Sequence, residues 1–100
     1  MGFRIDYARV IAQAGEIEEA SSRLAGQLRE LRSLEETCLS CWKGTASDAF
    51  LSKVRALYEE MSRTQKRLLT LASTIRYCAD QIQREDLEAE RRAELLKSEN

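Results

Sequence analysis

Residues 41–50, Cys-Trp-Lys-Gly-Thr-Ala-Ser-Asp-Ala-Phe, decide how this sequence folds. They lie near the middle of the chain and hold its single tryptophan. Gly44 can adopt the left-handed backbone conformation that ends many helices, because it has no Cβ atom. Thr45, with Asp48 three residues later, has the pattern of a cap that begins a helix. The stretch therefore predicts a turn at residues 42–45 between two antiparallel helices.

Before the turn, a row of mainly apolar and small residues recurs at alternating steps of four and three. Such spacing is typical of a helix that packs one face against another helix. It predicts a helix over residues 7–41, with Glu35 as the one charged interruption. Gly15 and Gly26 lie off the row, where we expect them to soften the helix and allow close approach of a neighbour. The members of the row are Val10, Ala14, Ile17, Ser21, Leu24, Leu28, Leu31 and Cys38.

A second row follows the turn and predicts a helix over residues 46–82. Its repeat averages three and a half residues, which is typical of left-handed, coiled-coil-like pairing. The row ends after Ile82, because the next positions in register are Glu85 and Ala89. We expect the tail, residues 83–100, to be flexible or a frayed helical extension that becomes ordered on a partner. The members of the row are Phe50, Val54, Leu57, Met61, Thr64, Leu68, Leu71, Ile75, Cys78 and Ile82.

A single hairpin of this kind has a thin core. Each buried aliphatic side chain contributes about 1.5–3 kcal/mol, whereas ordering the backbone opposes folding by about 1–2 kcal/mol per residue. We therefore predict an all-α fold, an antiparallel helix-turn-helix hairpin that dimerises into a four-helix bundle, with either itself or a different partner. The predicted dimer core consists of Leu24, Leu28, Leu31, Val54, Leu57, Met61, Leu68, Leu71 and Ile75.

The composition argues against catalysis and against a bound metal or cofactor. The chain has no histidine, and its acidic residues fall on helix positions expected to face solvent. Zinc normally requires four Cys or His ligands, so we interpret Cys38, Cys41 and Cys78 as small apolar thiols. Cys78 is too far from the turn for a disulfide within one hairpin, so only a neighbouring hairpin running the opposite way could bring it near Cys38 or Cys41. Tyr7, Tyr58 and Tyr77 lie outside the rows and are assigned no chemistry.

Charge and hydropathy narrow the functional classes further. Sixteen basic residues balance 17 acidic ones, which gives no electrostatic footprint for nucleic acid. The first residues hold no apolar segment long enough for a signal peptide or a membrane span. We therefore expect no cleavable leader and no integral membrane segment.

Trp42 has two interpretations that are compatible with each other. It can close the open end of the hairpin by packing against Phe50. Tryptophan is also a frequent anchor of protein interfaces, because it offers a large contact area at low entropic cost. One ring face could be packed and the other exposed to a partner.

The turn also carries a resemblance to a known family. A chain of about one hundred residues, with Trp42-x-Gly44 between two helices and Ala46 and Phe50 after it, resembles the WXG family of small ESAT-like proteins of type VII secretion systems. The resemblance covers nearly the whole chain. It implies a helical hairpin, an antiparallel four-helix dimer with itself or a WXG-family paralogue, and export without cleavage by a membrane ATPase of the FtsK/SpoIIIE type.

The resemblance also implies an export signal, Tyr-x-x-x-Asp/Glu, about forty residues after the tryptophan. In this sequence that spacing falls on residues 82–86, where Ile82 replaces the tyrosine and Asp86 supplies the acid, next to Glu85. Tyr77 does not satisfy the spacing. We expect either that the aromatic residue is dispensable or that a partner carries the full signal, and that an antiparallel dimer brings the turn of one hairpin beside residues 78–86 of the other.

Three functional hypotheses remain at this point. The first is a small non-enzymatic protein made in the cytoplasm and secreted, or displayed at the cell surface, by a type VII system. The second is a cytosolic helical adaptor that binds a larger secreted toxin and targets it for export. The third is an intracellular coiled-coil scaffold without any coupling to secretion.

Overall fold

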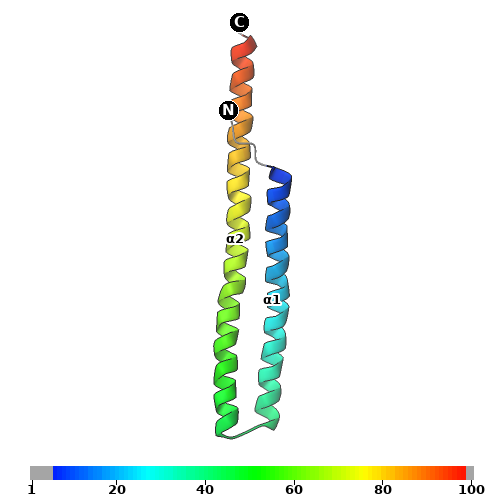
Figure 1. The fold of residues 1–100 in the computed structure, drawn as a ribbon, viewed down its shortest axis with the longest axis vertical. Coiled ribbons are helices and arrows are strands. Elements are labelled where there is room, and N and C mark those ends of the chain that lie inside the picture. Colours follow the sequence, from blue (N-terminus) through cyan, green and yellow to red (C-terminus); the bar gives the residue numbers. More distant parts are fainter. Residues whose placement is uncertain (1–5, 99–100) are drawn as a thin grey trace.

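The computed structural model describes residues 6–98, which form an antiparallel helical hairpin (Figure 1). Helix α1 spans Tyr7–Cys41 and helix α2 spans Thr45–Ser98. The molecule is a rod of 85 × 15 × 15 Å. The all-α hairpin expected from the two apolar rows is thereby confirmed, while dimerisation remains a prediction.

Hydrogen bonds to backbone groups define both ends of α1. The side chain of Asp6 accepts a hydrogen bond from the Arg9 amide at 3.1 Å, which satisfies one of the free N–H groups at a helix start. At the other end, the Trp42 amide donates to the Cys38 carbonyl at 2.9 Å. Residues 1–5 lie outside the described part of the chain.

Helix α2 does not end where its apolar row ends. It continues past Ile82 to Ser98, so the tail takes the helical one of its two expected forms, and it projects beyond the start of α1 (Figure 1). The sequence holds no proline and no glycine after Gly44, so nothing interrupts the backbone hydrogen bonds of α2. Two ion pairs also support this segment, and in each the partners lie one helical turn apart. They are Asp80–Arg84 at 3.0 Å and Glu88–Arg92 at 4.0 Å.

Small residues let the two helices approach closely. Ala14 and Ala72 are fully buried, and Ser21 and Ala79 are buried between the helices as well. The glycines do not serve this purpose within the hairpin, because a Cβ atom on Gly15 would meet only the end of the Arg76 side chain, at 3.9 Å. A comparable Cβ atom on Gly26 would likewise meet only a guanidinium group, at 3.7 Å.

Polar residues in the interface between α1 and α2 form hydrogen bonds with residues of the facing helix. The Ser21 hydroxyl donates to the Gln65 carbonyl at 3.2 Å and accepts from the Gln65 side-chain amide at 3.0 Å. Glu35, the charged interruption of the first row, receives a hydrogen bond from Arg55 at 3.2 Å. The hairpin therefore tolerates these polar residues in its rows because each has a partner on the facing helix.

Candidate functional site

The turn presents an aromatic pair. The rings of Trp42 and Phe50 have centroids 5.6 Å apart and planes tilted by 48°. Trp42 nevertheless remains 43% exposed and Phe50 38% exposed. The expected contact between these residues is therefore present, and each ring also leaves a large apolar area open to a partner.

Gly44 and Ser47 set the shape of the turn. Gly44 has φ of 121°, a conformation that residues with a Cβ atom rarely adopt. Ser47 is almost completely buried, and its hydroxyl donates to the Trp42 carbonyl at 2.9 Å. The expected capping role of Thr45 is wrong, because Thr45 is already the first residue of α2, and the carbonyl of Gly44 accepts from the Asp48 amide at 3.0 Å.

Sequence reasoning missed Ser47. A signal was available, because residues 47, 51 and 54 continue the four-and-three spacing back to the start of α2. That spacing places Ser47 on the side of α2 that faces α1, next to the turn. A hydroxyl at this position can reach the open backbone groups of the turn, as it does here.

The far end of the hairpin places Tyr7 beside Asp86. The Tyr7 hydroxyl donates to Oδ2 of Asp86 at 2.5 Å. This hydrogen bond, together with burial and the negative charges of Asp86 and Glu90, raises the pKa of Tyr7 to about 12. Tyr7 therefore stays a neutral donor at physiological pH, and its phenol ring lies next to the acid of the expected export signal.

The other members of that signal are accessible. Ile82 is 36% exposed, and Glu85 and Asp86 lie on exposed positions of α2. Within one chain, residues 82–86 and Trp42 lie at opposite ends of the paired part of the hairpin (Figure 1). The structure of a single chain therefore does not bring the two halves of the expected patch together.

A groove of about 230 Å³ lies next to this end, and its lining exposes only apolar surface. Val10 contributes from α1, and the remaining lining residues come from α2. They are Thr74, Ile75, Cys78, Ala79 and Ile82. The groove has the shape and chemistry to accept an apolar side chain from another molecule.

One side of the hairpin, which we call the apolar face, combines α1 and α2 residues. Leu24 lines the same hollow as Leu57 and Met61, and Val10 lines the groove just described with Cys78. Residues seven positions apart return to the same side of a paired helix. The face therefore comprises Val10, Ile17, Leu24, Leu31, Phe50, Leu57, Met61 and Leu71.

The predicted dimer core divides into three groups on this basis. Leu28 and Val54 are buried between α1 and α2 of one hairpin. Leu57 and Leu71 are each 49% exposed. Half-buried positions at the edge of the interface hold the others, which are Leu24, Leu31, Met61, Leu68 and Ile75.

The opposite side, which we call the clamped face, carries charged contacts between the helices. Arg76 donates two hydrogen bonds to Glu18, at 3.1 and 2.6 Å, and Arg55 pairs with Glu35 at 3.2 Å. The hydrogen bonds from Arg76 lower the pKa of Glu18, and the same contact raises the pKa of Arg76. Arg32 also lies over the Tyr58 ring, with 5.3 Å from its guanidinium carbon to the ring centroid.

The placement of this face follows from helix geometry. Glu18 follows Ile17 by one residue, and Arg76 follows Ile75 by one residue. One residue turns the side chain by about 100° around a helix. These charged side chains therefore lie across the interface from the apolar face, on the other side of the rod.

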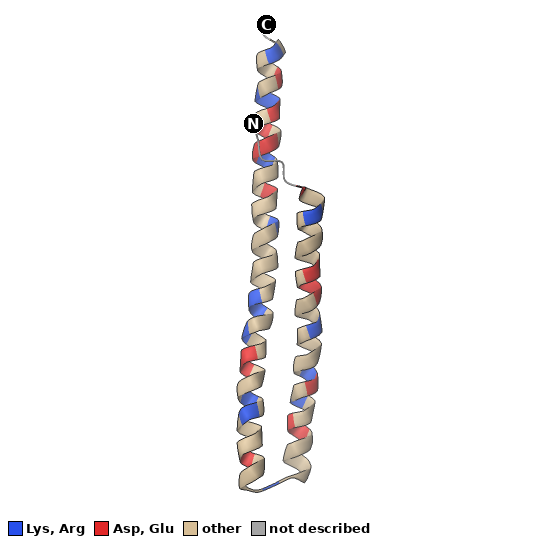
Figure 2. Ribbon diagram, viewed as in Figure 1, with Lys and Arg blue, Asp and Glu red and all other residues tan. Residues whose placement is uncertain are grey.

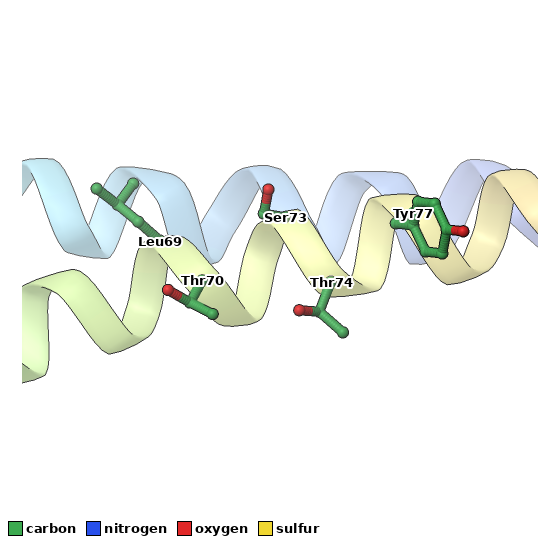
Figure 3. Close-up of a pocket in the computed structure, with 5 residues that line it drawn as sticks. All are labelled: Leu69, Thr70, Ser73, Thr74 and Tyr77. Atoms are coloured by element: carbon green, nitrogen blue, oxygen red, sulfur yellow. The ribbon is translucent and has the colours of Figure 1, made fainter.

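The remaining hollows offer no catalytic arrangement. The one drawn in Figure 3 lies on the outside of α2, where Leu69, Thr70, Ser73, Thr74 and Tyr77 project from a single helix. In residues 6–98, no group of three or more His, Cys, Asp or Glu side chains could hold a metal ion. Cys38, Cys41 and Cys78 are free thiols.

Electrostatics and hydropathy agree with a protein-binding surface. Figure 2 shows both signs of charge along both helices, and the formal net charge is −1. Neither α1 nor α2, over the residues that the structure describes, has a stretch apolar enough to cross a membrane. Exposed apolar residues occur on the apolar face, where they include Leu57 and Leu71, and also outside it, as at Leu34 and Leu69.

Comparison with known proteins identifies the family of the chain. No curated protein and no solved structure matches it. A family model described as proteins of 100 residues with WXG matches residues 2–87, which covers most of the sequence and includes the Trp42-x-Gly44 turn. The chain belongs to the WXG100 family.

Proposed function

We propose that this protein is a small, non-enzymatic substrate of a type VII secretion system that acts as an antiparallel dimer through partner recognition. Membership of the WXG100 family supports an association with type VII secretion. The observation that carries the proposal is the exposure of Trp42, which is 43% even though Phe50 packs against one side of its ring.

The turn is built to hold Trp42 in this position. The Ser47 hydroxyl donates to the Trp42 carbonyl, and the Trp42 amide donates to the Cys38 carbonyl at the end of α1. Gly44 adopts the positive φ angle with which the backbone enters α2. A side chain that is already held in its bound conformation loses little entropy on binding. Trp42 is thus suited to be an anchor for a partner or for the secretion machinery.

Tyr7 offers an answer to the tyrosine missing from the expected export signal. Its phenol ring comes from the start of α1 and is held beside Asp86 by a hydrogen bond. We propose that Tyr7, Ile82 and Asp86 together form the recognised surface, with the aromatic ring supplied across the hairpin instead of along α2. A chain without the linear signal would then still present an aromatic ring and an acid side by side.

Dimerisation completes the surface. An antiparallel partner would bring its own turn to the Tyr7–Asp86 end of this chain, so that each end of the bundle holds one Trp42 and one Asp86. Two such composite ends on one particle would bind a membrane ATPase of the FtsK/SpoIIIE type that offers two sites more tightly than either end alone. We thus propose two kinds of partner for this chain: the secretion ATPase, and a second hairpin that is either another copy or a WXG-family paralogue.

Export measurements test the proposal. We expect Trp42→Ala and Tyr7→Phe to reduce the amount of protein in the culture medium while leaving a folded, helical protein in the cell. Leu39→Ala is the matched control, because Leu39 is 47% exposed and lies three residues before Trp42. Unchanged export of Trp42→Ala, with export of the control also unchanged, would contradict the assignment of the turn.

The Gly44→Ala variant tests whether the backbone shape of the turn is needed, whereas Trp42→Ala tests the exposed side chain. An alanine at φ of 121° strains the backbone by roughly 1–3 kcal/mol and shifts the Trp42 ring. We expect export to fall together with a lower melting temperature. Normal export of a destabilised Gly44→Ala protein would mean that the shape of the turn is not recognised.

A second candidate function is an adaptor that carries a larger type VII toxin to the machinery. The observation in its favour is the part of α2 that extends beyond α1, where three leucines are exposed without a facing helix. They are Leu87, Leu95 and Leu96, with exposures of 56, 59 and 65%. Co-purification with a larger protein and retention in the cell would favour this function over that of a secreted substrate.

A further inference from the structure

The last turn of α1 holds two cysteines three residues apart, Cys38 and Cys41. Both are free thiols, and Cys41 is exposed while Cys38 is half-buried. Side chains three residues apart lie on the same side of a helix, because three residues complete about 300° of its rotation. The two thiols therefore share one face of α1, directly before the Trp42 turn.

Helix geometry decides what such a pair can form. A rise of about 1.5 Å per residue on a radius of about 2.3 Å places the two Cα atoms about 5 Å apart. A disulfide accepts Cα separations of about 4.4–6.8 Å, but it holds the Cβ atoms at about 3.5–4.5 Å. In a regular helix these Cβ atoms are about 5–6 Å apart. A bond between Cys38 and Cys41 therefore requires a small movement of the backbone.

Cys41 is the member of the pair that has room to move. It is the last residue of α1, and Trp42 after it is already extended, with φ of −135° and ψ of 124°. Its thiol donates to the Thr37 carbonyl at 3.0 Å, on the preceding turn, and the Ser40 hydroxyl donates to the same carbonyl at 2.8 Å. A thiol is a weak donor, and Ser40 keeps the carbonyl paired when the thiol leaves it. Rotation of Cys41 toward Cys38 therefore costs little.

A movement of Cys41 acts on Trp42, its neighbour in sequence. Two hydrogen bonds hold the Trp42 backbone: its amide donates to the Cys38 carbonyl at 2.9 Å, and its carbonyl accepts from Ser47 at 2.9 Å. The amide belongs to the peptide group that joins Trp42 to Cys41. A shift of Cys41 by about 1–2 Å therefore breaks the bond to Cys38 and disturbs the ring contact with Phe50.

We propose that Cys38 and Cys41 are a thiol oxidation site whose intramolecular disulfide releases Trp42 from its fixed position in the turn. The reactant is a small-molecule disulfide. One thiolate of the pair attacks it to form a mixed disulfide, and the second thiol then displaces the other half of the reactant. Two S–H bonds of the protein break and one S–S bond forms, while two protons and two electrons convert the reactant into two thiols.

The location of the protein determines when this step occurs. Cytosolic thiols are kept reduced, whereas disulfides persist in secreted proteins. An exported chain would therefore carry a fixed Trp42 before export and a released one afterwards. This link to export rests on the proposed function, but the chemistry of the thiol pair does not.

Oxidation of the purified protein tests the site. In a Cys78→Ser background, oxidised glutathione should leave no thiol for iodoacetamide and should remove two hydrogen atoms from the mass of the chain. The band on a non-reducing denaturing gel should stay near 11.4 kDa, because the second thiol lies on the same turn and has a high effective concentration. A covalent dimer, glutathione retained on the chain, or thiols that still react would overturn the intramolecular disulfide.

The matched control exchanges two neighbouring residues, combining Ser40→Cys with Cys41→Ser in the same background. Its composition is unchanged, but its thiols at positions 38 and 40 lie about 200° apart around the helix. Both thiols of the control should still react with iodoacetamide under conditions that close the parent pair. Equal closure in the control would overturn the assignment to the helical spacing of Cys38 and Cys41.

Hydrogen exchange of the Trp42 amide measures the consequence of oxidation. Exchange should be faster in the oxidised protein, because the hydrogen bond to the Cys38 carbonyl is lost, and dithiothreitol should restore the slower rate. A Cys41→Ser variant should show no difference between the two treatments. An oxidised protein whose Trp42 amide exchanges at the rate of the reduced protein would overturn the release of Trp42.

Failure of this inference and failure of the proposed function are distinguishable. Thiols that do not close in the purified protein would overturn the oxidation site and leave the secreted substrate intact. Protein in the culture medium that still carries both thiols would overturn the link to export. Normal export of Trp42→Ala would instead contradict the proposed function, even if the disulfide forms as expected.

Discussion

The clamped face and the apolar face border the same interface between α1 and α2, but the side chains at the two borders differ in kind. On the clamped face, Arg76 and Arg55 reach across to Glu18 and Glu35, so the side chains that border the interface find partners within one chain. On the apolar face, the bordering residues Leu57 and Leu71 are each 49% exposed. The charged side chains of the clamped face thus have partners within one chain, and we propose that a second molecule covers the apolar face.

This difference explains how a thin hairpin can be specific about its partner. Ion pairs at an exposed border add little stability, but they define which side of the helices stays in water. Leucines at the other border gain free energy only when they are covered. In the proposed dimer, this asymmetry favours association through the apolar face.

The largest effect is expected from a charge on the apolar face. In Leu57→Glu, the dimer would bury an unpaired carboxylate, which costs several kcal/mol and weakens association by more than two orders of magnitude. Leu69→Glu, at a position 46% exposed but off the apolar face, should leave association unchanged. Sedimentation equilibrium of both variants checks this, and equal dissociation constants would remove the distinction between the two sides of α2.

A smaller effect is expected from truncating a residue in the interface between α1 and α2, which lies between the two faces. Leu28 is 8% exposed between the helices, so Leu28→Ala should lower the free energy of unfolding by roughly 2–5 kcal/mol. Leu34→Ala removes the same atoms from a residue that is 45% exposed, and it should change stability far less. Urea unfolding followed by circular dichroism compares them, and a Leu34→Ala loss as large as that of Leu28→Ala would contradict the assigned interface.

The smallest effect is expected on the clamped face, and it depends on pH. The pKa of Glu18 is lowered by Arg76, so the stabilisation that this pair provides is complete above the ordinary pKa of glutamate. It is lost as the pH falls through the lowered pKa of the folded protein. Glu18→Gln should therefore melt slightly below the parent at neutral pH and match it in acid. If the difference in melting temperature between Glu18→Gln and the parent grew in acid, it would contradict the lowered pKa of Glu18.

The spacing of apolar residues was sufficient to predict the hairpin and the α1 side of its interface. Every member of the α1 row is buried or half-buried against α2. The α2 row mixes two sides, because Val54 is buried while Leu57 is exposed. A four-and-three pattern marks a stripe wide enough to serve two interfaces, and it does not say which members face which neighbour.

Other features depend on contacts between distant residues. The hydrogen bond between Tyr7 and Asp86 joins positions 79 residues apart, and it follows only once the register of the hairpin is known. The Ser47 hydroxyl is likewise fixed by the path of the turn. The apolar row ends at Ile82 although α2 continues to Ser98, because the loss of apolar spacing marks the end of burial and not the end of the helix.

The central claim is that the apolar face is covered by a second hairpin, and the mass of the particle in solution tests it most directly. Sedimentation equilibrium at micromolar concentration should give twice the 11.4 kDa of one chain, either for the protein alone or with its paralogue in a one-to-one complex. A protein that remains folded and helical as an 11.4 kDa monomer, alone and with every WXG-family paralogue of its host, would contradict the account.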